Sequence, residues 1–501
     1  MAKSIMIQGT ASNAGKSVIA AGLCRIFKQD GYKVAPFKSQ NMALNSFITK
    51  AGLEMGRAQV VQAEASGIEP DVDMNPVLLK PTGDSKSQVI VHGKIWNELS
   101  ARDYYNFKQH LIPKITESYR RLAGKFDIIV LEGAGSPAEI NLRDNDIVNM
   151  FMARLASAPV LLAADIDRGG VFASLAGTML LFTEDERSYV KGLIINKFRG
   201  DNSLLDSGLR QLEDITKKPI LGVIPYFHLD IDDEDSQSER LENIFSGGVV
   251  KIAVVRLPRM SNYTDFNVFG ASVKYCSTAK DLKDAGLIII PGTKNTMGDL
   301  AWMRKNGIED AVKKSAAEGK PVFGICGGYQ MLGVSIADPF NVEGGGDIDG
   351  MGLLPVETVF ETEKHMTRVS GRFLTLNGIF KDLSGKEIEG YEVHMGTTKP
   401  ACGLKMCNPL ALITDSVSGA ESIDGAYSGT VYGSYIHGIF DAENISTLIV
   451  NALYREAGIE YNGANEISAK QHKENQYDML ANILRDSIDL DRIYKILNAG
   501  I

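Results

Sequence analysis

A glycine-rich segment near the start of the chain has the residue types and spacing of a phosphate-binding loop. Residues 9–17 read GTASNAGKS and lie between a predicted strand and a predicted helix. In such a loop, backbone N–H groups and the positive end of the helix bind phosphate oxygens. Lys16 would reach the outer phosphates, and the hydroxyl of Ser17 would bind Mg²⁺. The spacing is one residue longer than G-x-x-x-x-G-K-[ST], and a glycine turn without a ligand is the alternative. The predicted nucleotide contacts are Gly9, Thr10, Asn13, Ala14, Gly15, Lys16 and Ser17.

Polar residues follow three further apolar runs, and each run is predicted to be a strand. Glu132 ends the run IIVLE, and Asn196 ends the run GLIIN. Ligands bind beyond the carboxyl ends of the strands in open parallel sheets. We therefore predict that Glu132 binds Mg²⁺ together with Ser17, and that Asn196 reads a nucleobase edge. The segment ADIDRGG follows the third run and supplies three candidates for a substrate or phosphoryl site: Asp165, Asp167 and Arg168. For Asp165 alone, formation of a turn is the alternative.

A cysteine in the second half of the chain lies between an apolar run and two glycines. Residues 323–332 read FGICGGYQML, which predicts a strand, a sharp turn and a helix. Glycines allow a strained turn and a close approach of substrate, and a thiolate at a helix N-terminus is stabilised by unpaired N–H groups. Cys326 is therefore a candidate nucleophile. A buried, inert thiol is the alternative.

A cysteine nucleophile needs a base, and two of the seven histidines are candidates. His437 follows a predicted strand in the segment GTVYGSYIHGIFD, and His394 lies in the segment GYEVHMGTT. We predict His437 as the base and retain His394 as its competitor.

The elements that would position these residues form two α/β alternations. The first contains predicted strands at 4–8, 34–36, 127–131, 159–163, 191–195 and 220–224, and the second at 251–256, 287–291, 321–325 and 430–436. Between about 344 and 430 the pattern predicts shorter antiparallel strands. The predicted domains are residues 1–232, an acidic linker at 233–249, residues 250–445 and a C-terminal helical segment at 446–501.

Composition narrows the class of protein. The chain is 44% hydrophobic and 23% charged, with a net charge of -9, which is typical of a globular protein and argues against a basic nucleic-acid-binding surface. Five cysteines without paired spacing favour a reducing compartment. Cys402 and Cys407 lie close together in the sequence. Because neither a second cysteine pair nor a histidine cluster lies near them in the sequence, we do not predict a zinc site there. We found neither a secretory signal nor a run of about 20 apolar residues, and we expect a cytoplasmic protein without a membrane partner.

Several longer segments resemble a known family. The loop at 9–17 and the run EGAG at 132–135 are similar to the dethiobiotin synthetase-like ATPases. The segments YKVAPFKSQNMALNSF, DMNPVLLKPTGDSKSQV, LEGAGSPAEINLRDNDIVNM and ADIDRGGVFASLAGT resemble the cobyric acid synthases, from residue 5 to about residue 440. The resemblance implies a P-loop parallel-sheet ATPase domain followed by a class I, flavodoxin-like glutamine amidotransferase domain with an antiparallel insertion.

The resemblance also implies an activity. Members use ATP, with Mg²⁺, and L-glutamine to amidate the b, d, e and g carboxylates of adenosylcobyrinic acid a,c-diamide, so the corrinoid is a substrate and not a cofactor. The two-domain architecture is shared with cobyrinic acid a,c-diamide synthase, which is the nearest alternative. A partition-type regulatory ATPase with an inactive glutaminase-like domain is a more distant one, and Thr10 stands where such ATPases carry a lysine.

Carried over by position, the family pattern makes Cys326 the nucleophile and His437 the base. Backbone N–H groups near Gly292 and Gly327 would form the oxyanion hole and bind glutamine. Typical class I glutaminases carry a glutamate two residues after the histidine, but Ile439 stands there in this chain. Glu392 is the candidate third residue. The candidates for corrinoid or nucleotide contacts are Gln40, Asn41, Asn75 and Lys80. Capping of loops and formation of turns is an equally good interpretation of these residues.

Overall fold

The computed structural model describes residues 2–81, 86–231, 250–402, 407–460 and 469–501. The chain divides into two compact units. The first unit comprises Met1–Ala43, Met55–Asp232 and His472–Ile501, and the second comprises Leu44–Glu54 and Asp233–Gln471. The predicted acidic linker at 233–249 lies outside the described residues.

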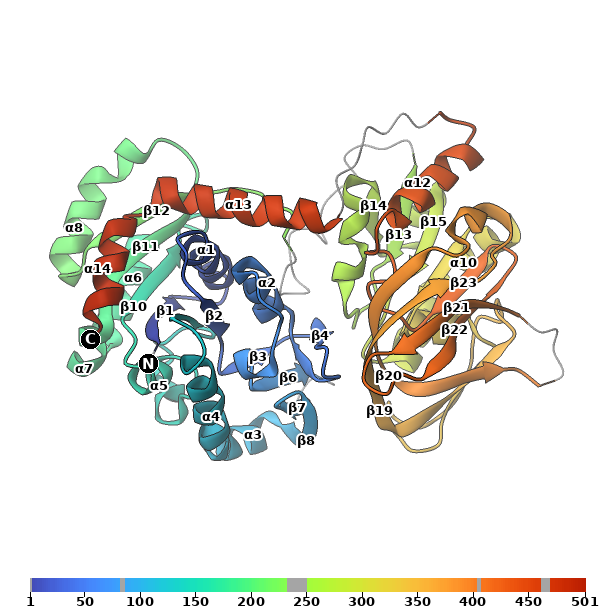
Figure 1. The fold of residues 1–501 in the computed structure, drawn as a ribbon, viewed down its shortest axis with the longest axis horizontal. Helices are drawn as coiled ribbons and strands as arrows, with labels where there is room; N and C mark the ends of the chain where they lie inside the picture. The colour runs from blue at the N-terminus through green and yellow to red at the C-terminus, as the bar shows by residue number, and fades with distance from the viewer. Residues whose placement is uncertain (1, 82–85, 232–249, 403–406, 461–468) are drawn as a thin grey trace. The chain divides into compact units, whose positions relative to one another are not determined.

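A six-stranded parallel sheet forms the centre of the first unit, in the order β12-β11-β10-β1-β9-β2 (Figure 1). The strands are β1 (Lys3–Gly9), β2 (Val34–Phe37), β9 (Ile128–Glu132), β10 (Val160–Asp165), β11 (Val190–Phe198) and β12 (Ile220–Pro225). All six predicted strands of this half are confirmed. Strands β1, β2, β9 and β10 are buried on both faces almost throughout, as expected for a parallel sheet that is covered by helices.

Ten helices and one small sheet accompany this sheet in the described part of the first unit. The helices are α1 (Lys16–Gln29), α2 (Arg57–Ser66), α3 (Ala101–Phe107), α4 (Ile112–Ala123), α5 (Met150–Leu155), α6 (Val171–Leu181), α7 (Glu184–Tyr189), α8 (Asp206–Thr216), α13 (Ala469–Ser487) and α14 (Leu490–Ala499). The small sheet contains β3 (Gln40–Met42), β6 (Val77–Pro81), β7 (Lys86–Val91) and β8 (Lys94–Ser100). A separate two-stranded sheet pairs β4 (Ser46–Ile48) with β5 (Glu54–Gly56). Strand β4 belongs to the second unit, which includes residues 44–54.

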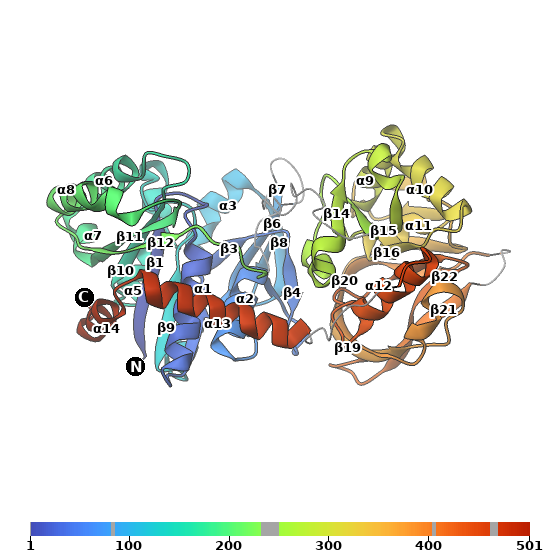
Figure 2. The same cartoon turned by 90° about the horizontal axis from the view of Figure 1, so that it is seen from above.

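Helix α13 packs along α1, although the two are separated by most of the sequence (Figures 1 and 2). Leu480 and Leu484 are fully buried in this contact, and burial of one leucine side chain contributes about 1.5–3 kcal/mol. A Cβ at Gly22 would lie 2.2 Å from Leu484 Cδ1, so glycine permits the close approach of the two helices. Arg25 forms ion pairs of 2.8 Å with Glu474 and Asp478. The predicted C-terminal helical segment is thus divided, since α14 and nearly all of α13 belong to the first unit and α12 belongs to the second.

A mixed sheet forms the centre of the second unit. Its parallel part has the order β14-β13-β15-β16-β23, and the antiparallel strands continue from β23. The parallel strands are β13 (Lys251–Val255), β14 (Val273–Cys276), β15 (Ala285–Ile290), β16 (Val322–Ile325) and β23 (Val431–Ser434). The remaining strands are β17 (Ser335–Asp338), β18 (Gly346–Asp349), β19 (Val356–Phe373), β20 (Glu387–Pro400), β21 (Asn408–Asp415) and β22 (Glu421–Ser428). The four described helices are α9 (Thr296–Lys305), α10 (Ile308–Ala317), α11 (Gly327–Leu332) and α12 (Ile445–Glu456). The predicted α/β unit with an antiparallel insertion is confirmed.

Candidate active sites

The loop between β1 and α1 has a conformation suited to phosphate. Gly15 adopts a positive φ of 89° immediately before α1 begins at Lys16. The ammonium group of Lys16 donates hydrogen bonds to the carbonyl oxygens of Ala11 (2.8 Å), Ser12 (3.0 Å) and Gly135 (3.0 Å). The lysine therefore lies over its own loop and joins it to the segment that follows β9, where it is in place to meet phosphate oxygens.

The carboxylate of Glu132, at the end of β9, accepts hydrogen bonds from side chains of three different segments. Its Oε1 accepts hydrogen bonds from the Ser17 hydroxyl (2.7 Å) and from Lys38 Nζ (2.9 Å), and its Oε2 accepts one from Gln62 Nε2 (2.7 Å). The carboxylate is 2% exposed. The two predicted Mg²⁺ ligands, Ser17 and Glu132, are thus in contact. A hydroxyl and a carboxylate are oxygen ligands of the kind that Mg²⁺ prefers, and the residues present fit this ion.

The other predicted residues of this edge lie at the ends of β10 and β11. Asn196 is buried against the loop, because its Nδ2 donates to the Ala14 carbonyl (3.0 Å) and its Oδ1 accepts from the Lys197 amide (2.9 Å). In this position it supports the loop, and its contact with a nucleobase stays a prediction. Asp165 accepts a hydrogen bond from Lys197 Nζ at 2.9 Å.

Asp167 and Arg168, the remaining two candidates, lie in the exposed turn after β10. Arg199 Nε donates to Asp167 at 3.0 Å, and the Arg199 guanidinium stacks over the Tyr226 ring. The turn therefore leaves Arg168 exposed at the carboxyl edge of the sheet, where the sequence predicted a substrate or phosphoryl contact.

The candidate substrate residues of the first unit are mostly engaged with their own chain. Asn75 is buried; its Oδ1 accepts from the Gly56 amide (3.0 Å) and its Nδ2 donates to the Val77 carbonyl (3.0 Å), which is the loop-capping arrangement. Asn41 is buried and donates to Gln59 at 3.1 Å. Gln40 accepts a hydrogen bond from the Tyr104 hydroxyl, and Lys80 is buried within β6.

In the second unit, Cys326 lies on a strained turn between β16 and α11. Its φ is 52° and its ψ is −109°, a region that residues with a Cβ rarely adopt. Such strain is typical of a nucleophile that is held at the end of a strand. A Cβ at Gly328 would lie 2.0 Å from the Ile290 carbonyl oxygen, which explains why a glycine follows the turn. Cys326 Sγ donates to the Val393 carbonyl at 3.7 Å.

His437 follows β23 and is held between Cys326 and Asp265. The imidazole is 2% exposed, and its Nδ1 donates to Asp265 Oδ2 at 2.7 Å. Asp265 Oδ1 accepts a second hydrogen bond, from the Gly438 amide, at 3.2 Å. Burial disfavours the imidazolium, but the Asp265 carboxylate and a hydrogen bond with the Cys326 side chain outweigh burial and raise the pKa of His437 to about 10. The three side chains form a Cys–His–Asp array.

Asp265 was not among the residues predicted from the sequence. It lies in the 3₁₀ segment Tyr263–Ser272, which follows β13, and β13 is in the same parallel sheet as β16 and β23. The sequence feature that could have indicated Asp265 is the polar run SNYTD. This run comes shortly after an apolar strand, at the carboxyl edge of the sheet where ligands are expected. The separation from His437 is 172 residues, so no local spacing relates the two.

Glu392 and His437 both belong to the described part of the chain, and the contact expected between them is not made. Tyr391 pairs with His437 through two backbone hydrogen bonds, and its ring stacks on the imidazole. Successive side chains of a strand point to opposite faces, so Glu392 points away from His437. Its Oε2 lies 3.0 Å from His365 Nε2. Ile439 is fully buried in the core, at the position where a glutamate was expected from class I enzymes.

The remaining predicted residues of this unit surround the Cys–His pair. A Cβ at Gly292 would lie 2.9 Å from His437 Cε1, and a Cβ at Gly327 would lie 2.9 Å from Thr293 Cγ2. The Gly292 backbone therefore approaches His437 closely, and Gly327 directly follows Cys326 in the chain. His394, the competitor for the role of base, donates through Nδ1 to the Gly396 carbonyl at 2.8 Å, and burial lowers its pKa to about 4.

The raised pKa of His437 predicts an unusual pH profile for glutamine hydrolysis. Because the pKa of His437 is raised well above that of an ordinary imidazole, the proton-donating imidazolium is retained through neutral pH and lost as pH rises toward 10. We expect kcat/KM for glutamine to show no inflection near pH 6.5 and to fall in the alkaline range. Initial rates of glutamate release across the pH range measure this. An ascending limb centred near pH 6.5 would contradict the raised pKa of His437.

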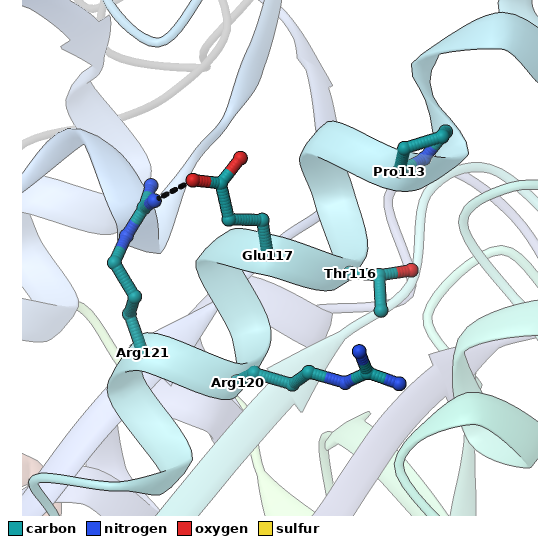
Figure 3. Close-up of a pocket in the computed structure, with 5 residues that line it drawn as sticks. All are labelled: Pro113, Thr116, Glu117, Arg120 and Arg121. Carbon is teal, nitrogen blue, oxygen red and sulfur yellow. Dashed lines mark hydrogen bonds and ion pairs between the residues drawn. The ribbon is translucent and has the colours of Figure 1, made fainter.

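A hollow lined by five residues of α4 is shown in Figure 3. It is lined by Pro113, Thr116, Glu117, Arg120 and Arg121. Arg121 forms ion pairs with Glu117 and Asp73. None of the predicted site residues lines this hollow, and we assign it no function.

Together, a P-loop unit and a unit with a Cys–His pair define an ATP-dependent glutamine amidotransferase. Residues 5–239 match the family described as the CobQ/CobB/MinD/ParA nucleotide binding domain, and residues 251–445 match the CobB/CobQ-like glutamine amidotransferase domain. The chain is 57% identical to a cobyric acid synthase of Ruminiclostridium cellulolyticum, over 100% of this chain and 98% of the relative. It is 52% identical to a cobyric acid synthase of Lachnoclostridium phytofermentans over 100% of both chains, and 51% identical to one of Dehalococcoides mccartyi over 100% of this chain and 99% of the relative. The chain belongs to the cobyric acid synthase family.

No helix in the described part of the chain combines the length and the apolar character that a membrane span requires.

Proposed function

We propose that this enzyme amidates the b, d, e and g carboxylates of adenosylcobyrinic acid a,c-diamide, with ATP as activator and L-glutamine as the nitrogen source. The observation that carries the proposal is the Cys326–His437–Asp265 array on one chain with a P-loop, within a sequence that resembles cobyric acid synthases from end to end. The five cysteines are all free thiols, which supports the cytoplasmic location expected from the sequence.

In the glutaminase half-reaction, the Cys326 thiolate attacks the side-chain amide carbon of glutamine. The carbonyl oxygen becomes an oxyanion, which the backbone N–H groups near Gly292 and Gly327 stabilise. His437 gives its proton to the leaving nitrogen, and ammonia departs to leave a glutamyl thioester. Water then attacks the thioester, His437 accepts its proton, and glutamate is released with the thiolate restored. Asp265 holds the imidazole in the orientation and protonation state that both steps need.

In the synthetase half-reaction, a peripheral carboxylate of the corrinoid attacks the γ-phosphorus of ATP. The products are an acyl phosphate and ADP, and ammonia then displaces phosphate to give the amide. Lys16 and the loop amides bind the phosphates, and Asn196 supports the loop from behind. Ser17 and Glu132 would hold Mg²⁺, which when bound neutralises charge on the transferring phosphoryl group. Contacts of the corrinoid with Gln40, Asn41, Lys80 or Arg168 stay predictions, and Asn75 is better explained as a loop cap.

The proposal is tested by the mass of the product. The enzyme is incubated with ATP, Mg²⁺, glutamine and the a,c-diamide, and we expect stepwise conversion of four acids to amides. Lys16→Ala should lower amidation by a factor on the order of 10² or more with either glutamine or ammonium salts, because activation by ATP precedes both. Lys28→Ala is the matched control, since Lys28 lies at the other end of α1 and is partly exposed. Amidation of cobyrinic acid at its a and c positions, with the diamide left unchanged, would replace the proposal with the a,c-diamide alternative.

A further inference from the structure

A group of three side chains in the second unit has no part in the reactions above. His365 lies on β19, and Glu392 and His394 lie on the neighbouring antiparallel strand β20. His365 and His394 are direct cross-strand partners, and Glu392 shares a face with His394 because side chains alternate along a strand. One nitrogen or oxygen atom from each residue lies within 4.8 Å of the other two. Among the residues that the structure describes, this is the one group of histidine, cysteine or carboxylate side chains close enough to hold a metal ion.

The ring of His394 is oriented like that of a metal ligand. Its Nδ1 lies 2.8 Å from the Gly396 carbonyl oxygen, which can only accept, so Nδ1 carries the proton and the lone pair is on Nε2. The ring also stacks on Tyr435, with centroids 3.8 Å apart. Histidines that ligate metals usually donate their other N–H to a carbonyl or carboxylate, which fixes the tautomer and the ring.

The other two side chains complete a site that is reachable from solvent. Glu392 is 7% exposed, and its Oε2 lies 3.0 Å from Nε2 of the half-exposed His365. The three residues line a cavity of about 690 Å³ together with Tyr435 and Cys407. Metal–ligand bonds of about 2.0–2.1 Å place neighbouring ligands of a tetrahedral ion about 3.3 Å apart. The three ligand atoms, all within 4.8 Å of one another, are therefore close enough for one small ion to bind them after small side-chain movements.

We propose that His365, Glu392 and His394 bind one divalent transition-metal ion of the Zn²⁺ type. Two imidazoles and one carboxylate are a ligand set that suits Zn²⁺ and leaves a fourth position open to water from the cavity. The backbone carbonyl of Val393, between the two ligands of β20, accepts the hydrogen bond from Cys326 Sγ. A bound ion therefore fixes the strand that lies beside the candidate nucleophile. This inference does not depend on the corrinoid substrate.

The test is metal binding by the full-length chain. Protein dialysed against a chelator is titrated with Zn²⁺ by calorimetry and with Co²⁺ by visible absorption. We expect one equivalent to bind, with affinity reduced at least about 10-fold in His365→Gln and in His394→Gln. Thermal unfolding with and without Zn²⁺ supplies a second readout, because an ion that binds only the folded state raises Tm.

His472→Gln is the matched control. His472 Nε2 lies 3.0 Å from Asp230 Oδ2, which is the same histidine–carboxylate pair at the same distance, in the first unit and outside any three-residue group of the described chain. His472→Gln should bind Zn²⁺ like the unaltered protein. Because His365 is half-exposed, His365→Gln keeps the test valid even if His394→Gln fails to fold.

Three results would overturn the proposal. The first is that Zn²⁺ does not bind stoichiometrically, which would mean that His365 and Glu392 form an ion pair and no metal site. Another is equal Zn²⁺ affinity in the two cluster variants and the control. The third is a thiolate-to-Co²⁺ charge-transfer band that disappears in Cys407→Ser, which would place the ion on a cysteine of the same cavity.

Discussion

Replacing Cys326 with alanine should abolish amidation with glutamine while leaving amidation with ammonium salts nearly unchanged. The alanine variant has no thiolate to form the glutamyl thioester, whereas the synthetase half needs only ammonia. Loss of a covalent nucleophile costs at least about 10³-fold. Glutamate release and corrinoid amidation, measured side by side with each nitrogen source, give the result.

Cys276→Ala is the matched control for this experiment. Cys276 is a buried thiol of the same unit, and burial raises its pKa to about 11, so it is protonated and inert at neutral pH. This variant should retain both activities. If Cys326→Ala loses activity with ammonium as well as with glutamine, Cys326 has a structural role and the assignment of the nucleophile is wrong.

The second large effect is expected at Asp265, which we infer to be the positioning residue of the glutaminase site. In Asp265→Asn, the side chain can present an N–H group to Nδ1 of His437, which favours the wrong tautomer and removes the charge that holds the imidazolium. The corresponding change in serine proteases lowers kcat about 10⁴-fold. We expect kcat for glutamine to fall about 10²–10⁴-fold, with little change in KM and with ammonium-dependent amidation retained.

Two further measurements separate positioning from a general structural effect. Alkylation of Cys326 at neutral pH, followed by mass spectrometry, should slow in Asp265→Asn because the thiolate loses its imidazolium partner. Asp265→Glu keeps the carboxylate and should recover part of the lost rate. Asp382→Asn, which removes a partly exposed carboxylate paired with Arg455, should leave the alkylation rate unchanged. An unaltered alkylation rate in Asp265→Asn would show that Asp265 does not act through His437.

Residues that act through contiguous motifs could be predicted from the sequence. The segment GTASNAGKS contains its strand end, loop, lysine and hydroxyl within nine consecutive positions (9–17), and the segment FGICGGYQML contains a whole strand–turn–helix. In both segments, local backbone geometry largely determines where the side chains lie. The six strands of the first parallel sheet and four of the five parallel strands of the second unit were predictable for a similar reason, since strands buried on two faces are continuous apolar runs. The fifth, β14, is only partly buried and was not predicted.

Tertiary structure alone decided which residues complete each site. Asp265 reaches His437 because β13 and β23 belong to one parallel sheet, which brings their following segments to the same edge across a separation of 172 residues. Glu392 was the nearer candidate in sequence, but pairing of Tyr391 with His437 turns its side chain to the opposite face, toward His365 and His394. Strand pairing and register are not specified by any local sequence pattern. They place the Asp265 carboxylate against the His437 imidazole and the Glu392 carboxylate in the group that we propose as a metal site.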